Sequence, residues 1–457
     1  MALAIHERSP AVQAMAKHWP LIDALLGGTP AMRAAGLAYL PQQPREDAED
    51  YAYRLSTATL FPAFARTAAV MAGKPFSKEL VLGEDVPPEV AQWIGDIDGE
   101  GRSLHAFAAD LMHEAITHGY GGILVDYTRT EGAARTQADE RTMGARPYWV
   151  HIKHDRILGW KIGKVNGLPA LIQLRITETE EVPDGDYGVK TVNRVRVYTP
   201  GAFELWEEGG NGQYTLIDQG SMAPLTEIPF VPFYGTREGF MVGLPPLLEL
   251  AHLNAKHWRE QSDQDDSARF ARKRLLVVSG IDSDSPITSG SSYALSLPQG
   301  GDAKVVQGSA ESVTVGRSEL DALEAQMLQT GAELLTRQPG SRTATESSND
   351  AEANKSELQR IVETFEDSLD RALDLTAQWL GQPKGGTLSL YKDFAAPINA
   401  QDSQAILALQ QAGIITKETV IRESQRRALL SPDLVPEDEL EAVSTEGPAL
   451  GALGGDR

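Results

Sequence analysis

The sequence has no cysteine among its 457 residues. This absence excludes a disulfide framework, thiolate metal sites, iron–sulfur clusters and cysteine catalysis, and it agrees with a reducing compartment. No stretch reaches the roughly 18 consecutive apolar residues of a membrane-spanning helix. The first residues, MALAIHERSP, lack the apolar core of a secretory signal, and neither end carries a lipidation motif. We therefore predict no membrane association.

Familiar catalytic motifs are also missing. The phosphate-binding pattern G-x-x-x-x-G-K-[ST] and the nucleophile elbow G-x-S-x-G do not occur. The 64 acidic residues are too many to select a catalytic pair, because separation in space decides that chemistry. We predict no catalytic residues, no cofactor and no enzymatic activity. An acidic cytosolic hydrolase with a β domain is the alternative from another functional class.

Two histidine patterns come near known metal motifs. His113, Glu114 and His118 resemble H-E-x-x-H with one extra residue, which places the two histidines on different faces of a helix. His151 and His154 have an odd spacing in or beside a strand, which places them on opposite faces. We therefore predict packing or surface roles for these residues and no metal site.

Acidic residues outnumber basic ones, and the formal net charge is −22. Such a charge argues against a protein that grips DNA phosphates over its whole surface. It is compatible with a protein past which nucleic acid slides. The apolar fraction of 41% is sufficient for folded cores, and the length predicts two to four structural units.

The first part of the chain, residues 1–130, is predicted to be mainly helical. One helix is expected to begin after Ser103, a good N-cap residue, and to end at Gly119. The apolar run that follows, GGILVDYT, predicts a strand. Over residues 146–235 the period changes to two, as in the alternation of Ile172, Leu174 and Ile176, which predicts an antiparallel meander of five to seven strands.

The remaining chain returns to helical spacing, so the fold class is α+β. The segments predicted are a helix over 244–272, a small β-rich excursion over 273–316, a helix over 317–336, a polar break over 337–346, a long helix over 347–381, a strand and two helices over 382–430, and a mobile tail over 431–457. The helix over 244–272 is apolar up to Trp258 and polar nearly all round after it. A helix of this kind bridges domains, packs on copies of itself or is unstable, and no partner for it is evident in the chain.

This order of elements resembles that of the tailed-bacteriophage portal, or head–tail connector, protein. Local sequence resembles a portal-like phage family usually described only as a domain of unknown function, over roughly residues 35–430. The segments that carry the resemblance are YLPQQPREDAEDYAYRLSTATLFPAFARTAAVMAGKPFSK, GYGGILVDY, EIPFVPFYGTREGF, GLPPLLELAHLNAKHWREQSD and TATESSNDAEANKSELQRIVETFEDSLDRAL.

The resemblance implies a portal fold with six named parts. They are a helical and β wing (1–240), two stem helices (244–272 and 317–336), a small β-rich clip (273–316), a channel loop (337–346), a long spine helix (347–381) and a short helical crown (382–430), before the tail. Little chain remains after the spine helix, so an extended helical barrel above the crown is not expected.

The resemblance also implies a function. Portal subunits form a ring, typically of twelve, at one capsid vertex, and the ring is the conduit for DNA packaging and ejection. The implied partners are other copies of the chain, the terminase large subunit, major capsid and scaffold proteins, head-completion or tail adaptor proteins, and double-stranded DNA without sequence specificity. The implied location is the virion, and the host cytoplasm during assembly. A phage connector or assembly protein that does not conduct DNA is the third hypothesis.

Two sets of candidate residues follow from this resemblance. In a ring the polar half of the first stem helix meets copies of itself, which gives the inter-subunit candidates Asp263, Asp265, Asp266, Arg269 and Arg272. The channel loop supplies candidates for weak contact with DNA, namely Arg337, Gln338, Ser341 and Arg342.

Overall fold

The computed structural model describes residues 3–128, 144–165, 167–272, 275–279, 300–306, 308, 310–335, 356–392, 408, 410–413, 415–426, 430 and 434–445. The chain divides into two units, residues 1–390 and 391–457. Helices and antiparallel sheets both occur, so the fold class is α+β as predicted. Within the described ranges, no helix combines the length and apolar character that a membrane crossing requires.

The N-terminal part of the first unit is mainly helical, as predicted. Its elements are α1 (Pro10–Met15), α2 (Trp19–Leu26), α3 (Gly28–Ala35), η1 (Gly36–Ala38), α4 (Ala48–Thr57), α5 (Ala63–Gly73), η2 (Lys74–Phe76), β1 (Val81–Leu82), α6 (Pro88–Ala91), η3 (Ile94–Asp96), α7 (Leu104–His118) and β2 (Tyr120–Tyr127).

Helix α7 begins and ends where the sequence predicts. The Ser103 hydroxyl accepts a hydrogen bond from the backbone N–H of Ala106 at 3.3 Å, which satisfies one of the free donors of the first turn. Gly119 follows the helix with a φ of +76°. A Cβ atom there would lie 2.1 Å from the carbonyl carbon of Leu244. Glycine is therefore required both for the left-handed backbone and for the close approach of another segment.

Strand β2 is the central strand of a three-stranded antiparallel sheet. Its neighbours are β3 (Pro147–Ile152) and β9 (Phe230–Tyr234). The first six residues of β2 are all buried. At Gly121 the ring of Phe233 covers the backbone so closely that a Cβ atom there would lie only 2.4 Å from it. The strand thus accepts aromatic rings directly on its backbone.

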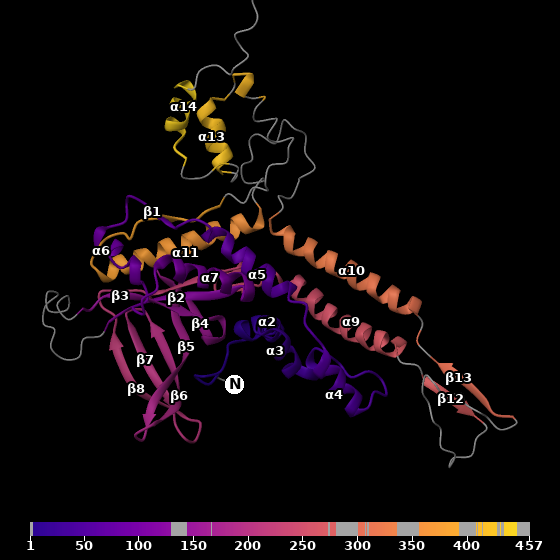
Figure 1. Ribbon diagram of the computed structural model, residues 1–457. Coiled ribbons are helices and arrows are strands. Elements are labelled where there is room, and N and C mark those ends of the chain that lie inside the picture. Colours follow the sequence, from indigo (N-terminus) through magenta and orange to yellow (C-terminus); the bar gives the residue numbers. More distant parts are fainter. Residues whose placement is uncertain are drawn as a thin grey trace, which may run out of the picture. The chain divides into compact units, whose positions relative to one another are not determined.

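Helices α7 and α11 (Glu357–Trp379) both pack on this sheet (Figure 1). Two tryptophans fix α11 to it by hydrogen bonds as well as by burial. The indole N–H of Trp149 on β3 donates to Thr376 Oγ1 at 2.8 Å, and that of Trp379 donates to the carbonyl of Val125 at 3.0 Å. Burying an indole without such a partner would cost about 1–3 kcal/mol.

The predicted meander is confirmed as a five-stranded antiparallel sheet. Its strands follow in sequence order: β4 (Ile157–Val165), β5 (Leu168–Asp184), β6 (Gly188–Thr199), β7 (Ala202–Glu208) and β8 (Tyr214–Ser221). Leu174 and Ile176 are buried while the residue between them is partly exposed, as the alternation predicts. Strands β3 and β9 lie in the same stretch of sequence but pair with β2, because their largely apolar runs suit the buried sheet better.

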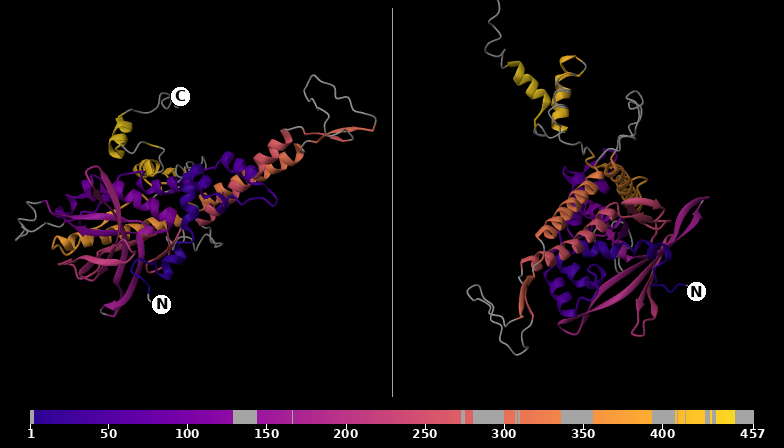
Figure 2. Two further views of the ribbon diagram at one scale, coloured as in Figure 1. Left: turned by 90° about the horizontal axis from the view of Figure 1, so that it is seen from below. Right: turned by 90° about the vertical axis from the view of Figure 1, so that its right-hand side faces the viewer.

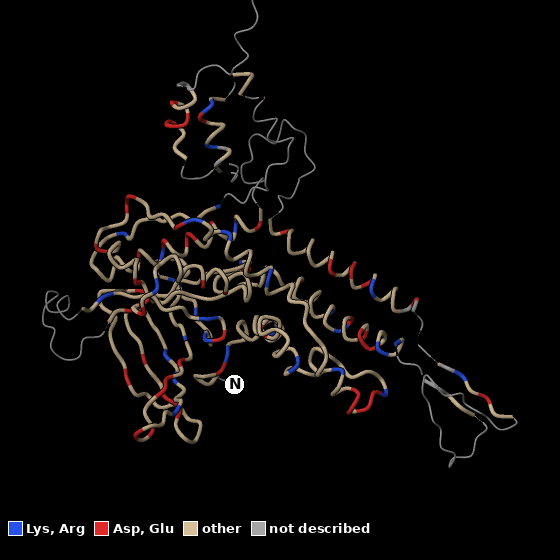
Figure 3. The backbone as a smooth tube through the Cα atoms, in the orientation of Figure 1, with Lys and Arg blue, Asp and Glu red and all other residues tan. Residues whose placement is uncertain are grey.

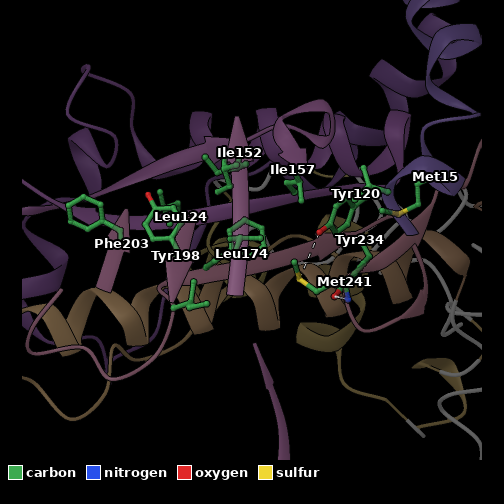
Figure 4. Close-up of a cluster of buried hydrophobic side chains, with 14 of the residues drawn as sticks. Met15, Tyr120, Leu124, Ile152, Ile157, Leu174, Tyr198, Phe203, Tyr234 and Met241 are labelled. Carbon is green, nitrogen blue, oxygen red and sulfur yellow. Dashed lines mark hydrogen bonds between the residues drawn. The ribbon is translucent and has the colours of Figure 1, made fainter. Parts of the chain in front are cut away.

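Side chains from both sheets and from the N-terminal helices form one core cluster (Figure 4). Met15 of α1, Tyr120 of β2 and Tyr198 of β6 are among its buried members. The loop formed by β10 (Thr236–Gly239) and β11 (Val242–Leu244) contributes Met241 to the same cluster. The meander is therefore attached to the central sheet by a continuous apolar contact.

A pair of long helices follows. These are α9 (Leu248–Arg272) and α10 (Ala310–Glu333), with the strand pair β12 (Leu275–Ser279) and β13 (Asp302–Val306) between them in sequence. Helix α10 begins at residue 310, whereas the sequence predicts a start at 317. Val313 and Val315 have a strand-like spacing, but β-branched residues are only slightly unfavourable in helices, and packing against α9 outweighs that preference.

Helix α11 begins at Glu357 in the described residues, and the predicted residues 347–355 lie outside them. A capping box defines its start, since Ser356 and Gln359 each accept from the other's backbone N–H. Farther along, Glu366, Asp370 and Asp374 accept hydrogen bonds of 2.6–2.8 Å from backbone N–H groups of residues 385–390. These carboxylates hold β14 (Leu388–Ser389), which pairs with β1, against the helix.

In the second unit, the helices that the structure describes are α13 (Lys417–Arg426) and α14 (Pro436–Thr445). Arg422 joins them, because its guanidinium lies 2.7 Å from Glu418 of its own helix and 3.2 Å from Glu437 of the other. These side chains are exposed, so each pair contributes at most about 1 kcal/mol.

We predict that Asp370→Asn stabilises the first unit at neutral pH. Burial is the largest of the effects that raise the pKa of Asp370 to about 6; the charges of Glu366 and Asp367 act in the same direction, and the hydrogen bond from Leu388 opposes them. An acid with a raised pKa contributes stability that is fully present below its unfolded pKa and is lost as the pH rises through its folded pKa of about 6. Asparagine keeps the acceptor oxygen without the charge. Thermal unfolding should show a midpoint about 1–3 °C higher at pH 7.5 and no difference near pH 4. Asp186→Asn, in an exposed turn, is the matched control, and a gain that persists at pH 4 would contradict the prediction.

Candidate assembly site on helices α9 and α10

Helix α9 changes character along its length. Its first half buries Leu250, Ala251 and Trp258, and this half packs on α2 and α5. Its second half is mostly exposed and charged. The predicted division of the helix near Trp258 is therefore present in the structure.

Helix α10 lies beside α9 along much of its length (Figures 1 and 2). His257 Nε2 lies 3.3 Å from Glu324 Oε1, and the Gln264 amide donates to the carbonyl of Val313 at 2.7 Å. Gly316 makes room for the same amide, since a Cβ atom there would lie 2.2 Å from Gln264 Oε1. These contacts correct the expectation that the polar half has no partner in its own chain. Polar side chains and a glycine make the contact, so apolar spacing does not reveal it.

Asp263 is the predicted site residue most closely tied to its own chain. Its carboxylate accepts a hydrogen bond from the Gln43 amide at 2.8 Å and lies 3.5 Å from the Arg54 guanidinium. Arg54 is only 4% exposed and is held by Glu46 at 2.6 Å. The hydrogen bond from Arg54 lowers the pKa of Glu46. The pair Arg54–Glu46 is therefore a buried charge pair that connects α4 and the preceding turn to α9.

The other four predicted contact residues have partners within α9 itself. Asp265 accepts from the Gln261 amide at 2.8 Å, and Asp266 lies 3.6 Å from Arg269. Arg272 donates to a carbonyl oxygen one turn earlier at 3.1 Å. Exposed contacts of this strength are worth about 0–1 kcal/mol, so exchanging them for contacts on another molecule costs little. The structure places all the predicted stem residues on one helix.

The four residues predicted for the channel loop, Arg337, Gln338, Ser341 and Arg342, lie outside the described residues. The nearest described residues are Leu335 before this segment and Ser356 after it. The backbone N–H of Leu358, in the first turn of α11, donates to the carbonyl of Leu334, just after α10, at 3.0 Å. The chain just after α10 and the start of α11 are therefore in contact, and α11 does not simply continue α10.

A groove of about 910 Å³ runs between α9 and α10. Its charged lining is mainly acidic and comprises Glu260, Asp263, Glu311 and Glu319 with Lys256. Figure 3 shows acidic positions on both helices. The groove therefore presents a surface suited to basic or hydrogen-bonding side chains of another molecule.

One cluster of polar side chains was missed by the sequence patterns. His118 and His154, which belong to two different near-motifs, lie together with Asp23 and Glu114. His118 therefore lies beside His154 of the other near-motif, a proximity that the spacing argument did not consider. The actual neighbours come from three separate elements, and no local spacing encodes their proximity.

Comparison with known proteins identifies a family model in this region. Residues 246–380, which contain α9, α10 and α11, match a family described as a domain of unknown function (DUF4055). The match confirms the predicted resemblance to a family described in that way. No curated protein matches the chain.

The chain is also similar to chains in three solved structures of a gene transfer agent (GTA) particle. One is the virion of the native particle, with 14% identity, a TM-score of 0.39, and coverage of 86% of this chain and 97% of that chain. A second is the neck of the empty particle computed with C6 symmetry, with 16% identity and a TM-score of 0.40. The third is the neck of the native particle computed with C12 symmetry, with 16% identity and a TM-score of 0.37. Each of these two matches covers 87% of this chain and 98% of that chain.

We predict that Arg54→Met destabilises the first unit by about 3–5 kcal/mol, because Glu46 would remain buried without its cation. Asp263→Asn is the matched variant on the exposed side of the same cluster, where the carboxylate is 51% exposed. It should cost less than about 1 kcal/mol. Urea unfolding followed by tryptophan fluorescence measures both. Equal effects of the two substitutions would show that Arg54 is not the residue that anchors α4 to α9.

Proposed function

We propose that this chain is the subunit of a portal-like ring at one capsid vertex, through which DNA enters and leaves. The ring would also be the docking site for the terminase large subunit and for head-completion or tail adaptor proteins. The chain would act as a structural conduit without catalysis of its own.

The observation that carries this proposal is the arrangement around α9 and α10. The two helices lie side by side, and the strand pair β12–β13 lies at one end of them (Figures 1 and 2). At the other end the flanks of segment 336–355 meet through the Leu358–Leu334 hydrogen bond. This is the arrangement expected of two stem helices with a clip at one end and a channel loop at the other. The family match covers the same region.

Charge supports a conduit rather than a tight DNA-binding protein. The chain carries a net charge of −22, and a ring of copies multiplies it. Strong pairing of many lysine and arginine side chains with DNA phosphates would hold the DNA in place, because each contact releases counterions and adds affinity. An acidic channel wall repels the phosphate backbone of DNA and keeps the duplex in the centre of the channel. A few arginines on a loop then supply weak, repeated contacts, and Arg337 and Arg342 are the proposed ones.

The exposed half of α9 is the proposed subunit contact. The acidic residues Asp263, Asp265 and Asp266 and the basic residues Arg269 and Arg272 lie within three turns of one helix. A neighbouring copy rotated about the ring axis can present its basic positions to these acidic ones. Heterologous contacts of this kind close into a ring when the rotation allows.

We predict that the full-length protein forms a ring of about twelve subunits with an axial channel, measured by native mass spectrometry and electron microscopy.

Asp265→Lys should shift the population toward smaller species, because it replaces an attraction between subunits with a repulsion. Asp186→Lys makes the same charge change in the exposed turn between β5 and β6 and should leave the ring intact. A stable monomer with a substrate pocket would favour the hydrolase, and a ring without a channel would favour a non-conducting connector.

We predict that replacing both Arg337 and Arg342 by alanine reduces DNA packaging or DNA retention while leaving ring assembly unchanged. Each arginine contributes a phosphate contact, so the salt dependence of DNA association should also weaken. The measurement is nuclease-protected DNA per particle. Lys190→Ala, in the β6 strand of the meander, is the control for loss of a basic residue. Unchanged packaging in the double variant would show that this segment is not the DNA contact.

A further inference from the structure

Four polar side chains from three elements gather beside Trp19 at the base of the N-terminal helices. They are Asp23 of α2, Glu114 and His118 of α7, and His154 of the turn η4 (His154–Arg156). The two imidazole rings are stacked, with centroids 3.8 Å apart and planes 9° from parallel. The side chains of His118 and His154 are only 6% and 8% exposed, whereas that of Asp23 is 60% exposed. The cluster is therefore buried on one side and open to solvent on the other.

Glu114 occupies the Nδ1 side of both rings. Its Oε1 lies 2.5 Å from His154 Nδ1 and also accepts the backbone N–H of His154 at 3.1 Å. Its Oε2 lies 3.7 Å from His118 Nδ1. A carboxylate is an acceptor only, so His154 must carry its proton on Nδ1, which leaves a lone pair on Nε2.

His118 has a polar neighbour at each ring nitrogen. Its Nδ1 lies 3.0 Å from the Thr117 hydroxyl, which also lies 2.7 Å from the carbonyl oxygen of His113. Its Nε2 lies 3.0 Å from the Asp23 carboxylate. Without an ion an Nε2–H donates to this carboxylate, whereas with a metal ion both atoms become available as ligands.

We propose that Asp23, His118 and His154 form a site for a divalent transition-metal ion, with Zn²⁺ as the best match. One ligand atom from each of the three residues lies within 4.8 Å of the other two. Two imidazole nitrogens and one carboxylate oxygen are a characteristic zinc donor set, with water in the fourth position. The solvent-exposed side at Asp23 provides that position.

Glu114 is the positioning residue of the proposed site. A histidine that binds zinc through Nε2 almost always donates its Nδ1–H to a carboxylate or carbonyl, which orients the ring and increases its basicity. Glu114 makes this contact with His154 and faces Nδ1 of His118. Tetrahedral zinc bonds of about 2.0–2.2 Å place ligand atoms roughly 3.4 Å apart, so the 3.0 Å contact between His118 Nε2 and Asp23 would lengthen slightly. The stacked rings would also have to turn until their Nε2 atoms point at the ion.

The bound ion would connect parts of the first unit that are distant in sequence. Asp23 belongs to α2, which also packs on α9, whereas His118 and His154 belong to the elements around β2 and β3. Metal binding would therefore fasten α2 to the central sheet. It would stabilise the folded chain by mass action, because the ligands are apart in the unfolded chain.

The test uses the full-length protein after treatment with a chelator. Calorimetric titration with Zn²⁺ alone should give one ion per chain, and Zn²⁺ but not Mg²⁺ should raise the thermal unfolding midpoint. Asp23→Asn should weaken zinc affinity at least about tenfold, and Asp23→His, which restores a ligand, should recover much of it. Asp155→Asn removes a neighbouring carboxylate that is not a ligand, and it should bind zinc like the natural chain.

Co²⁺ provides a second measurement, because its visible absorption reports coordination by nitrogen and oxygen ligands directly. His154→Gln should abolish this absorption in a protein whose circular dichroism remains that of the natural chain. Absence of zinc binding by the natural chain would overturn the proposal. Binding that is unchanged in both Asp23→Asn and His154→Gln would overturn it as well, since the ion would then lie elsewhere. In either case a hydrogen bond from Nε2–H of His118 to Asp23 would account for their contact.

Discussion

Burial of strand β2 within the central sheet is the constraint on which the rest of the first unit depends. The strand has β3 and β9 on its edges, and helices α7 and α11 pack on the sheet that it centres. Glycine at 121 and 122 allows phenylalanine rings to lie directly on its backbone. The buried part of a strand in this position must be apolar, as residues 120–125 are, and its neighbours must satisfy the backbone hydrogen bonds. The meander and helix α1 share an apolar core cluster with this sheet, whereas α9 packs on helices α2 and α5.

The α9–α10 pair is stabilised in a different way from that core. Trp258 marks the last large apolar side chain of α9 that is buried, and beyond it contacts are made by amides, carboxylates and guanidinium groups. Such contacts are individually weak in water, whereas exposed apolar surface here would favour aggregation of the free chain. A surface of this composition is consistent with the subunit contact that we propose for α9.

Arg54 shows how a polar helix can nevertheless be placed accurately. Its guanidinium is buried with Glu46 and reaches Asp263 on α9, so one charge cluster determines where the polar half of α9 lies relative to α4. A buried charge pair adds little net stability over an apolar one, but removing one member is costly. The cluster therefore favours one arrangement of these helices over alternatives.

The sequence by itself determined the elements whose signals are local. Ser103 and Gly119 delimit α7, and the two-residue period of Ile172 to Ile176 identifies the meander, because capping and alternation depend only on neighbouring residues. Tertiary structure alone decided which strands share a sheet, that α10 begins at residue 310, and that α9 has α10 as its partner. It also brought Asp23, His118 and His154 together. Those outcomes depend on contacts between residues far apart in the chain, and no pattern within a single segment records them.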